Sequence, residues 1–126
     1  MGVMHTMTNT EIIDHYLAAW NEPDAAIRLE QVEATWVDEG LLVDPLIEAV
    51  GPEAIAAAIG GLRDQMPGHA LVRTTNVDTH HDHARFGWTV IAPDDSVAVA
   101  GIDVVTFTDG RIQTAIGFFG ELEAAS

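Results

Sequence analysis

Apolar residues recur every three or four positions in the first half of the chain, which is the period of an amphipathic helix. The apolar stripe of the first expected helix consists of Ile13, Tyr16, Leu17 and Trp20. Thr8 and Glu11 have the spacing of a capping box, in which two backbone N–H groups at a helix start are satisfied reciprocally. The pattern therefore predicts a helix that begins after Thr8 and ends at Asn21-Glu22-Pro23.

Two further helices are expected in this half of the chain. The second begins after the cap residue Asp24 and ends at Gly40. Its expected buried face consists of Ala25, Leu29, Val32 and Trp36. The third is opened by Gly51-Pro52 and closed by Pro67-Gly68, and its inward positions are Ile55, Ile59, Leu62 and Met66. Between these two helices, the short apolar run 41–43 predicts a strand that ends at Asp44-Pro45.

The second half of the chain alternates apolar and polar residues, which is typical of β-strands. Four strands are expected, at about residues 69–78, 82–92, 96–107 and 111–119. They are separated by the turn sequences His80-His81, Pro93-Asp94-Asp95 and Asp109-Gly110. Helices followed by an antiparallel meander predict an α+β domain with the helices on one face of the sheet.

The length of 126 residues, of which 48% are hydrophobic, suits one domain with one core. Residues 1–8 are expected to be a disordered extension, and residues 9–122 the domain. The sequence contains no run of eighteen apolar residues, so no transmembrane helix is predicted. The first ten residues lack the basic and apolar regions of a secretory signal. We therefore expect a cytoplasmic protein, and the Ala-rich, Lys-free composition suggests a bacterial one.

The charge balance excludes two classes of partner. Twenty acidic residues face five arginines and no lysine, which gives a formal net charge of −15. Nucleic acids and anionic membranes would both be repelled by such a surface. Cysteine is absent, which rules out disulfides and thiol nucleophiles.

The expected strand at 96–107 is apolar on both of its faces. One face carries Val97, Val99, Gly101, Asp103, Val105 and Phe107, and the other carries Ala98, Ala100, Ile102 and Val104. Both faces should therefore be covered. We expect one face to pack against the helices and the other against a second copy of the chain, in a homodimer.

Asp103 is the one charged residue among these apolar neighbours. Loss of hydration raises the pKa of a carboxyl group, so that a buried acid can be neutral and donate a hydrogen bond. The alternative is that Asp103 pairs with an arginine, such as Arg73 or Arg85, or accepts a backbone N–H.

Tyr16 and Asp44 are the other candidate site residues. Tyr16 is the only tyrosine and lies on the apolar stripe of the first helix, where its hydroxyl needs a partner. Asp44 ends a short buried strand before Pro45. Each has a structural alternative: a core tyrosine bonded to a backbone carbonyl, and an aspartate that only forms a turn.

The order of these motifs resembles the nuclear transport factor 2-like (SnoaL-like) superfamily, and within it the Δ5-3-ketosteroid isomerases. The resembling segments are His15-Tyr16-Leu17-Ala18-Ala19 with Asn21 and Asp24, then Val43-Asp44-Pro45, then Ile102-Asp103-Val104 with Phe107 and residues 110–114. The resemblance implies a cone-shaped, curved antiparallel β-sheet with three N-terminal helices enclosing an apolar pocket. It also implies that Asp44 is a general base and that Tyr16 and protonated Asp103 donate hydrogen bonds to a substrate oxyanion, without a cofactor.

The same resemblance implies a hydrophobic small-molecule substrate of steroid or polyketide type. The aromatic residues expected to bind it are Trp20, Trp36, Trp88, Phe118 and Phe119. Two alternatives stay open: a polyketide cyclase or epoxide-opening enzyme with the same pocket, and a non-catalytic ligand-binding or dimerisation module. Arg85 is followed two residues later by Gly87, so the Arg-x-Asp pattern of the epoxide hydrolases is absent.

His80, His81 and His83 form the only metal-like cluster. A zinc site needs three or four ligands, and this cluster lies in an expected hairpin turn. The favoured interpretation is a solvated turn, with no metal site.

Overall fold

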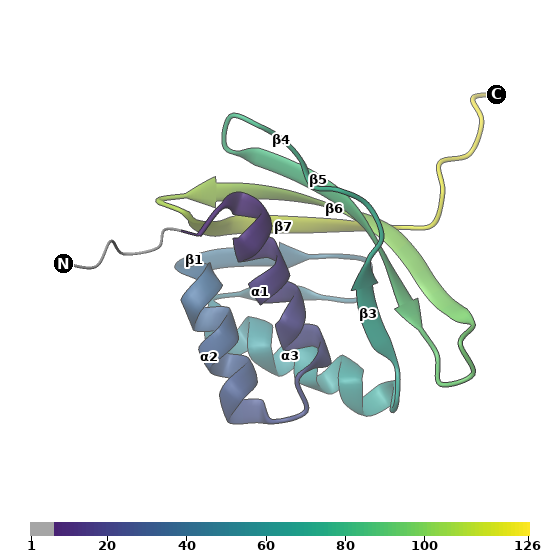
Figure 1. Ribbon diagram of the computed structural model, residues 1–126, viewed down its shortest axis with the longest axis horizontal. Helices are drawn as coiled ribbons and strands as arrows, with labels where there is room; N and C mark the ends of the chain where they lie inside the picture. Colours follow the sequence, from purple (N-terminus) through teal and green to yellow (C-terminus); the bar gives the residue numbers. More distant parts are fainter. Residues whose placement is uncertain (1–6) are drawn as a thin grey trace.

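A curved β-sheet with three helices against one face forms the structure, a computed structural model that describes residues 7–126 (Figure 1). The helices are α1 (Asn9–Asn21), α2 (Ala25–Thr35) and α3 (Pro52–Gln65). The strands are β1 (Trp36–Val43), β2 (Glu48–Val50), β3 (Ala70–Arg73), β4 (Asp78–His80), β5 (His83–Ile91), β6 (Val97–Thr108) and β7 (Arg111–Phe119). The expected α+β class is confirmed. The expected disorder of residues 1–8 falls mostly outside the described residues and stays a prediction.

The capping residues read from the sequence begin the helices as expected. The Thr8 hydroxyl accepts from the Glu11 backbone N–H at 3.1 Å, and the Glu11 carboxylate accepts from the Thr8 N–H at 3.2 Å. The Asp24 carboxylate accepts from two backbone N–H groups in the first turn of α2. Gly51, at a φ of 88°, leads into Pro52 at the start of α3. These caps fix where each helix starts, and so which residues face the sheet.

The expectation that the second helix continues to Gly40 is wrong. Helix α2 ends at Thr35, and Trp36 adopts an extended conformation and begins β1. Trp36 continues the helical spacing of Leu29 and Val32, and its pairing with Ile112 of β7 decides in favour of the strand. The buried residues of α2 are Arg28, Val32 and Thr35, and the expected Ala25 is exposed.

The sheet has the order β2-β1-β7-β6-β5-β3, with β4 paired to β5. The expected all-antiparallel sheet is wrong at one pair, because β1 and β7 run parallel. These two strands are separated by α3 and the whole meander, so no hairpin constrains their directions. Strand β2 was not expected, since three residues carry too little pattern. The expected strand at 69–78 is interrupted where Gly87 N–H donates to the Thr75 hydroxyl instead of continuing the ladder.

The two faces of the sheet have different surroundings. The face toward the helices forms the core, whose largest fully buried side chains are Trp36, Tyr16, Ile13, Ile55, Ile59 and Ile112. The face away from the helices is exposed in the single chain. Among the described residues, no helix is long and apolar enough to cross a membrane.

Candidate functional site

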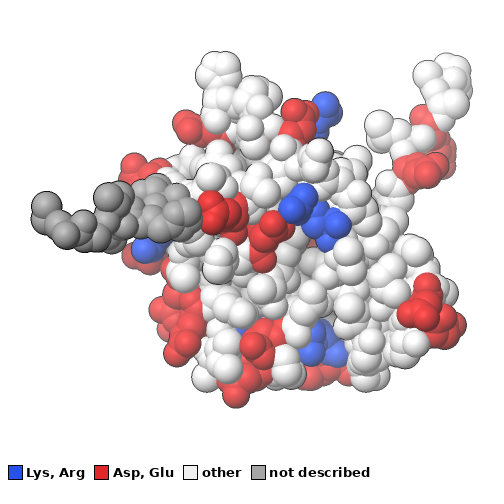
Figure 2. Space-filling model, viewed as in Figure 1, with Lys and Arg blue, Asp and Glu red and all other residues white. Residues whose placement is uncertain are grey.

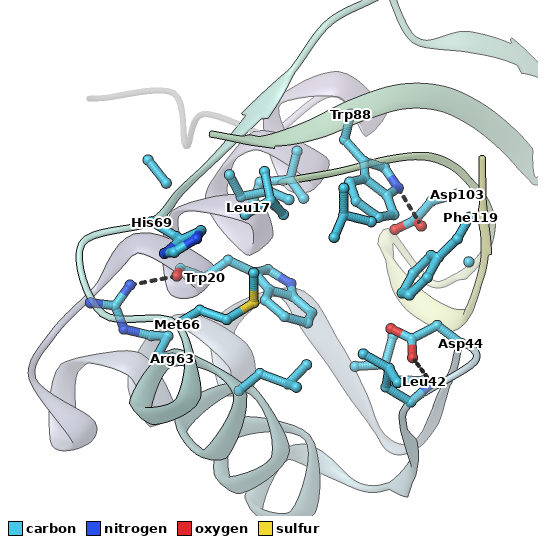
Figure 3. A pocket seen from close by; sticks show the side chains of 17 residues that line it. Leu17, Trp20, Leu42, Asp44, Arg63, Met66, His69, Trp88, Asp103 and Phe119 are labelled. Carbon is cyan, nitrogen blue, oxygen red and sulfur yellow. Dashed lines mark hydrogen bonds between the residues drawn. The ribbon is translucent and has the colours of Figure 1, made fainter. Parts of the chain in front are cut away.

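An apolar pocket lies between the helices and the inner face of the sheet (Figure 3). Its apolar wall includes Leu17, Leu42, Leu62, Leu71, Val90 and Val99. The cavity volume is about 90 Å³, well below the roughly 300–1,000 Å³ of drug-sized ligand sites. The pocket as it stands therefore suits a small ligand, or one end of a larger ligand.

Asp103 projects into this pocket from the middle of β6. The Trp88 indole N–H donates to Asp103 Oδ1 at 2.8 Å. Trp88 is paired across the strands with Gly101, and a Cβ at position 101 would overlap the Trp88 ring. The missing side chain at Gly101 thus allows the indole to lie across β6 and reach the carboxyl two residues along.

Burial raises the pKa of Asp103 to about 6, and the nearby Asp44 carboxylate also raises it, against a lowering by the Trp88 hydrogen bond. The direction agrees with the sequence-based expectation. The size of the shift is smaller than a fully neutral acid requires, because a carboxyl group with a pKa near 6 is only about one-tenth protonated at pH 7. The neutral form of Asp103 is therefore the main one only below pH 6.

Asp44 lies directly after β1, where it forms a turn and also lines the pocket. Its Oδ1 accepts from the backbone N–H groups of Leu46 at 2.7 Å and Ile47 at 2.9 Å, which is an Asx-type turn. Its Oδ2 has no hydrogen-bond partner among the described residues, and the side chain lines the pocket. The turn thus orients the carboxylate and leaves one oxygen available.

Gly117 brings the two aspartates together. A Cβ built on Gly117 would lie 2.9 Å from Asp103 Oδ1 and 3.1 Å from Asp44 Cβ. The two carboxyl-bearing side chains therefore flank the same small space. The sequence signal for this was a glycine inside a strand, which often marks a close approach by a ligand or another chain segment.

The arginines expected as alternative partners of Asp103 are engaged elsewhere. Arg73 pairs with Asp14 at 2.8 Å, and Arg85 pairs with Asp78 at 2.8 Å. The alternative in which either arginine neutralises Asp103 is wrong, since both point to carboxylates outside the pocket.

Tyr16 is fully buried and does not line the pocket. Its ring packs edge-on against Trp36, with centroids 5.3 Å apart, and its hydroxyl has no hydrogen-bond partner among the described residues. Burial raises the pKa of Tyr16 far above its ordinary value; Asp103 and then Asp44 raise it further, and Trp20 partly offsets this. The phenol is therefore a neutral donor that lies near the Trp20 indole and both aspartates, set behind the pocket wall.

Three of the five expected aromatic residues line the pocket, namely Trp20, Trp88 and Phe119. Trp36 belongs to the core against Tyr16 instead. Phe118 is 60% exposed and lies on the other face of the sheet, because successive strand residues alternate between faces. A pocket role for Trp36 and Phe118 was therefore wrong.

Two pocket residues were missed by the sequence reasoning. Arg63, in the last turn of α3, and His69, just before β3, line the side of the pocket away from the aspartates (Figure 3). Arg63 adjoins Leu62 and lies three residues before Met66, both of which were expected to face inward. The spacing of Arg63 from Leu62 and Met66 on the helix was the sequence signal that could have placed it at the pocket.

The histidine cluster lies in the exposed β4–β5 hairpin. The His80 and His83 rings stack with centroids 5.7 Å apart. Within residues 7–126, no three His, Cys, Asp or Glu side chains are placed to hold a metal ion.

Comparison with known proteins gives one consistent result. Residues 13–115 match the family model of the SnoaL-like domain. A solved structure from Agrobacterium tumefaciens strain C58, provisionally described as an isomerase of the SnoaL-like family, is 38% identical, with a TM-score of 0.83 over 87% of this chain and 95% of that one. No curated protein matched the sequence.

More distant structures share the fold alone. A protein from Sinorhizobium meliloti, provisionally described as a polyketide cyclase, is 16% identical, with a TM-score of 0.69 over 90% of this chain and 99% of that one. An NTF2-like protein of unknown function from Cytophaga hutchinsonii is 10% identical, with a TM-score of 0.70 over 94% and 95%.

Replacement of Asp103 by Asn tests the burial of its carboxyl. The pKa of Asp103 is raised from 3.8 to about 6 on folding, so its ionisation above pH 6 destabilises the folded state. At 1.36 kcal/mol per pKa unit, Asp103→Asn should increase the free energy of unfolding by up to about 3 kcal/mol at pH 8. The gain should shrink as the pH falls through 6 toward 4. Urea unfolding across this range measures it, with the exposed Asp109→Asn as the control, and a gain independent of pH would contradict the burial argument.

Proposed function

The chain belongs to the SnoaL-like family, and on that premise we propose that its pocket catalyses proton transfer at a carbon next to the carbonyl group of a small apolar substrate. The observation that carries the proposal is the pair Asp44 and Asp103. Both side chains flank the space next to Gly117 inside an apolar pocket, and neither is paired with an arginine. Carboxyl groups with different environments in one cleft are suited to separate acid and base roles.

Asp44 is the base in this mechanism. The two backbone N–H groups hold Oδ1, so Oδ2 faces the substrate in a fixed orientation. It removes a proton from the carbon next to the carbonyl, and the electron pair moves onto the carbonyl oxygen to give an enolate. Return of the same proton to another carbon of the conjugated system yields an isomer without any other reactant.

Asp103 is the donor to the enolate oxygen, and Tyr16 is a second donor set behind the pocket wall. Protonated Asp103 has a free oxygen besides the one bonded to Trp88, and the Tyr16 hydroxyl lies near both aspartates. A donor that is already buried needs little rearrangement when the negative charge develops. An apolar substrate displaces water from the pocket and so removes more hydration from Asp103. This raises the pKa of Asp103 further and favours the protonated carboxyl, which can donate a hydrogen bond.

The cavity volume of about 90 Å³ favours a substrate smaller than a four-ring steroid. In a non-catalytic module, a buried carboxyl would be expected to pair with an arginine, whereas Arg73 and Arg85 pair with Asp14 and Asp78 and not with Asp103. The first consideration favours a compact ketone, and the second favours a catalytic role over a non-catalytic one.

Isomerisation of cyclohex-3-enone to cyclohex-2-enone, followed by ultraviolet absorbance, tests the proposal. The wild type should accelerate it, and Asp44→Asn should lower the rate by about 10²–10⁴ because the amide cannot accept the proton. Asp109→Asn makes the same chemical change in the exposed β6–β7 turn and should leave the rate unchanged. 5-Androstenedione, assayed in parallel, should react more slowly. A wild type that accelerates neither ketone would contradict the proposed reaction.

We also propose that the chain forms a homodimer through the outer face of β6 and β7. The residues Ile102, Val104, Ile116 and Phe118 are 36–60% exposed there. The strand pairing places Ile102 opposite Phe118, and Val104 opposite Ile116, so these side chains form one continuous apolar surface. A surface that two identical chains both present can pair about a two-fold axis. A second copy is the proposed occupant because it presents the same apolar surface.

The mass in solution, measured by light scattering, tests the dimer. The wild type should have twice the 13.5 kDa mass of the chain, and Phe118→Glu should reduce this to one chain, since a charge would be buried without a partner. Ile27→Glu introduces the same charge at an exposed position of α2 and should leave the dimer intact. A wild type with the mass of a single chain would contradict the proposed homodimer.

A further inference from the structure

The pocket has two ends of opposite charge. Asp44 and Asp103 lie at one end, and Arg63 and His69 lie at the other, with Trp20 and Met66 between them (Figure 3). The walls between the two ends are apolar. The acid–base chemistry of the proposed function uses only the aspartate end, so the basic end is unexplained by it.

Arg63 has hydrogen-bonding capacity left over. Its Nη1 donates to the Trp20 carbonyl at 2.7 Å, which ties the end of α3 to the end of α1. No carboxylate pairs with its guanidinium among the described residues, so Nη2 and Nε remain available. A guanidinium fork of this kind matches the two oxygens of a carboxylate.

Most of the other arginines are already engaged. Arg28 donates to the Glu22 carbonyl at 2.7 Å, and Arg73 and Arg85 form the ion pairs described above. Arg111 is exposed at the start of β7 and does not line the pocket. Arg63 is therefore the one described arginine that lines the pocket.

His69 adds a second polar group at this end. Its Nδ1 lies 3.1 Å from the Pro67 carbonyl, and since a carbonyl oxygen only accepts, Nδ1 carries a proton in this contact. In the neutral ring Nε2 is then an acceptor, so it can receive a hydrogen bond from a ligand but cannot donate one to a carboxylate. His69 lies near Asp94 and contributes to lowering the pKa of that carboxyl group. The Asp94 carboxylate accepts a hydrogen bond from the Ser96 N–H and none from His69.

From this arrangement we propose that Arg63 binds a carboxylate of the substrate, with His69 beside it, which makes the substrate a small oxo acid. The identity of the reacting end rests on the proposed function, whereas the carboxylate end rests on Arg63 alone. Acidic side chains are spread over the face of the molecule in Figure 2, with few basic ones between them, and the net charge is −15. An anion is thus attracted only where a local positive group stands.

The same charges fix the orientation of the substrate. A carboxylate placed between Asp44 and Asp103 would meet like charge, and one placed at Arg63 meets opposite charge. The apolar walls fit the hydrocarbon between the two groups. The neutral carbonyl therefore comes to the aspartates, where the proton transfer takes place.

Binding of hexanoate and hexanamide tests this without any turnover. The two probes have the same chain and differ in charge, and calorimetry or the fluorescence of Trp20 and Trp88 measures their affinity. The wild type should bind hexanoate about tenfold or more tightly than hexanamide, as expected for charge-assisted hydrogen bonds. Arg63→Gln should remove that preference and leave the affinity for hexanamide unchanged, and Arg63→Lys should keep part of it.

Arg111→Gln is the matched control, because it removes the same charge from a surface position outside the pocket. It should leave both affinities unchanged. Equal binding of the two probes by the wild type, or an equal loss of both in a folded Arg63→Gln variant, would overturn the proposal. Since no reaction is measured, loss of isomerase activity in the ketone assay leaves this result standing, and the reverse also holds.

Discussion

The burial of the Asp103 carboxyl in the middle of β6 is the constraint on which the rest of the site depends. A carboxyl group in an apolar pocket has to be protonated, paired with a cation or hydrogen-bonded. Neither Arg73 nor Arg85 reaches it, and the Trp88 indole supplies one hydrogen bond at 2.8 Å. The result is a pKa raised to about 6, which places its protonation near the working range of a general acid.

Strand register supplies the neighbours that this carboxyl needs. The antiparallel pairing of β5 with β6 sets Trp88 opposite Gly101, where the indole can cross the strand. The parallel pairing of β1 with β7 sets Val43 beside Ile116, so the following residues, Asp44 and Gly117, come together at the end of β1. One parallel pair in the sheet thus determines which two acids share the pocket.

The sequence was sufficient for those features that depend on local pattern. The capping residues Thr8 and Asp24, the start of α3 and the inward position of Asp103 all follow from short-range rules, and the structure agrees with them. The error at Trp36 arose because a strand and a helix share apolar positions over a few residues. The parallel β1–β7 pair and the roles of Gly101 and Gly117 depend on contacts between distant segments, which a single sequence does not encode locally. Arg63 was missed for a similar reason, since its position in the pocket depends on how α3 docks against α1.

Carboxyl ¹³C NMR of the wild type, titrated from about pH 3 to about pH 9 with Asp103 assigned by the signal lost in Asp103→Asn, measures the central quantity directly. We expect the Asp103 resonance to titrate with a midpoint about pH 6. A midpoint near the ordinary value of 3.8 would show that the carboxyl is hydrated or paired with a cation, and would contradict its burial in an apolar pocket without a cationic partner.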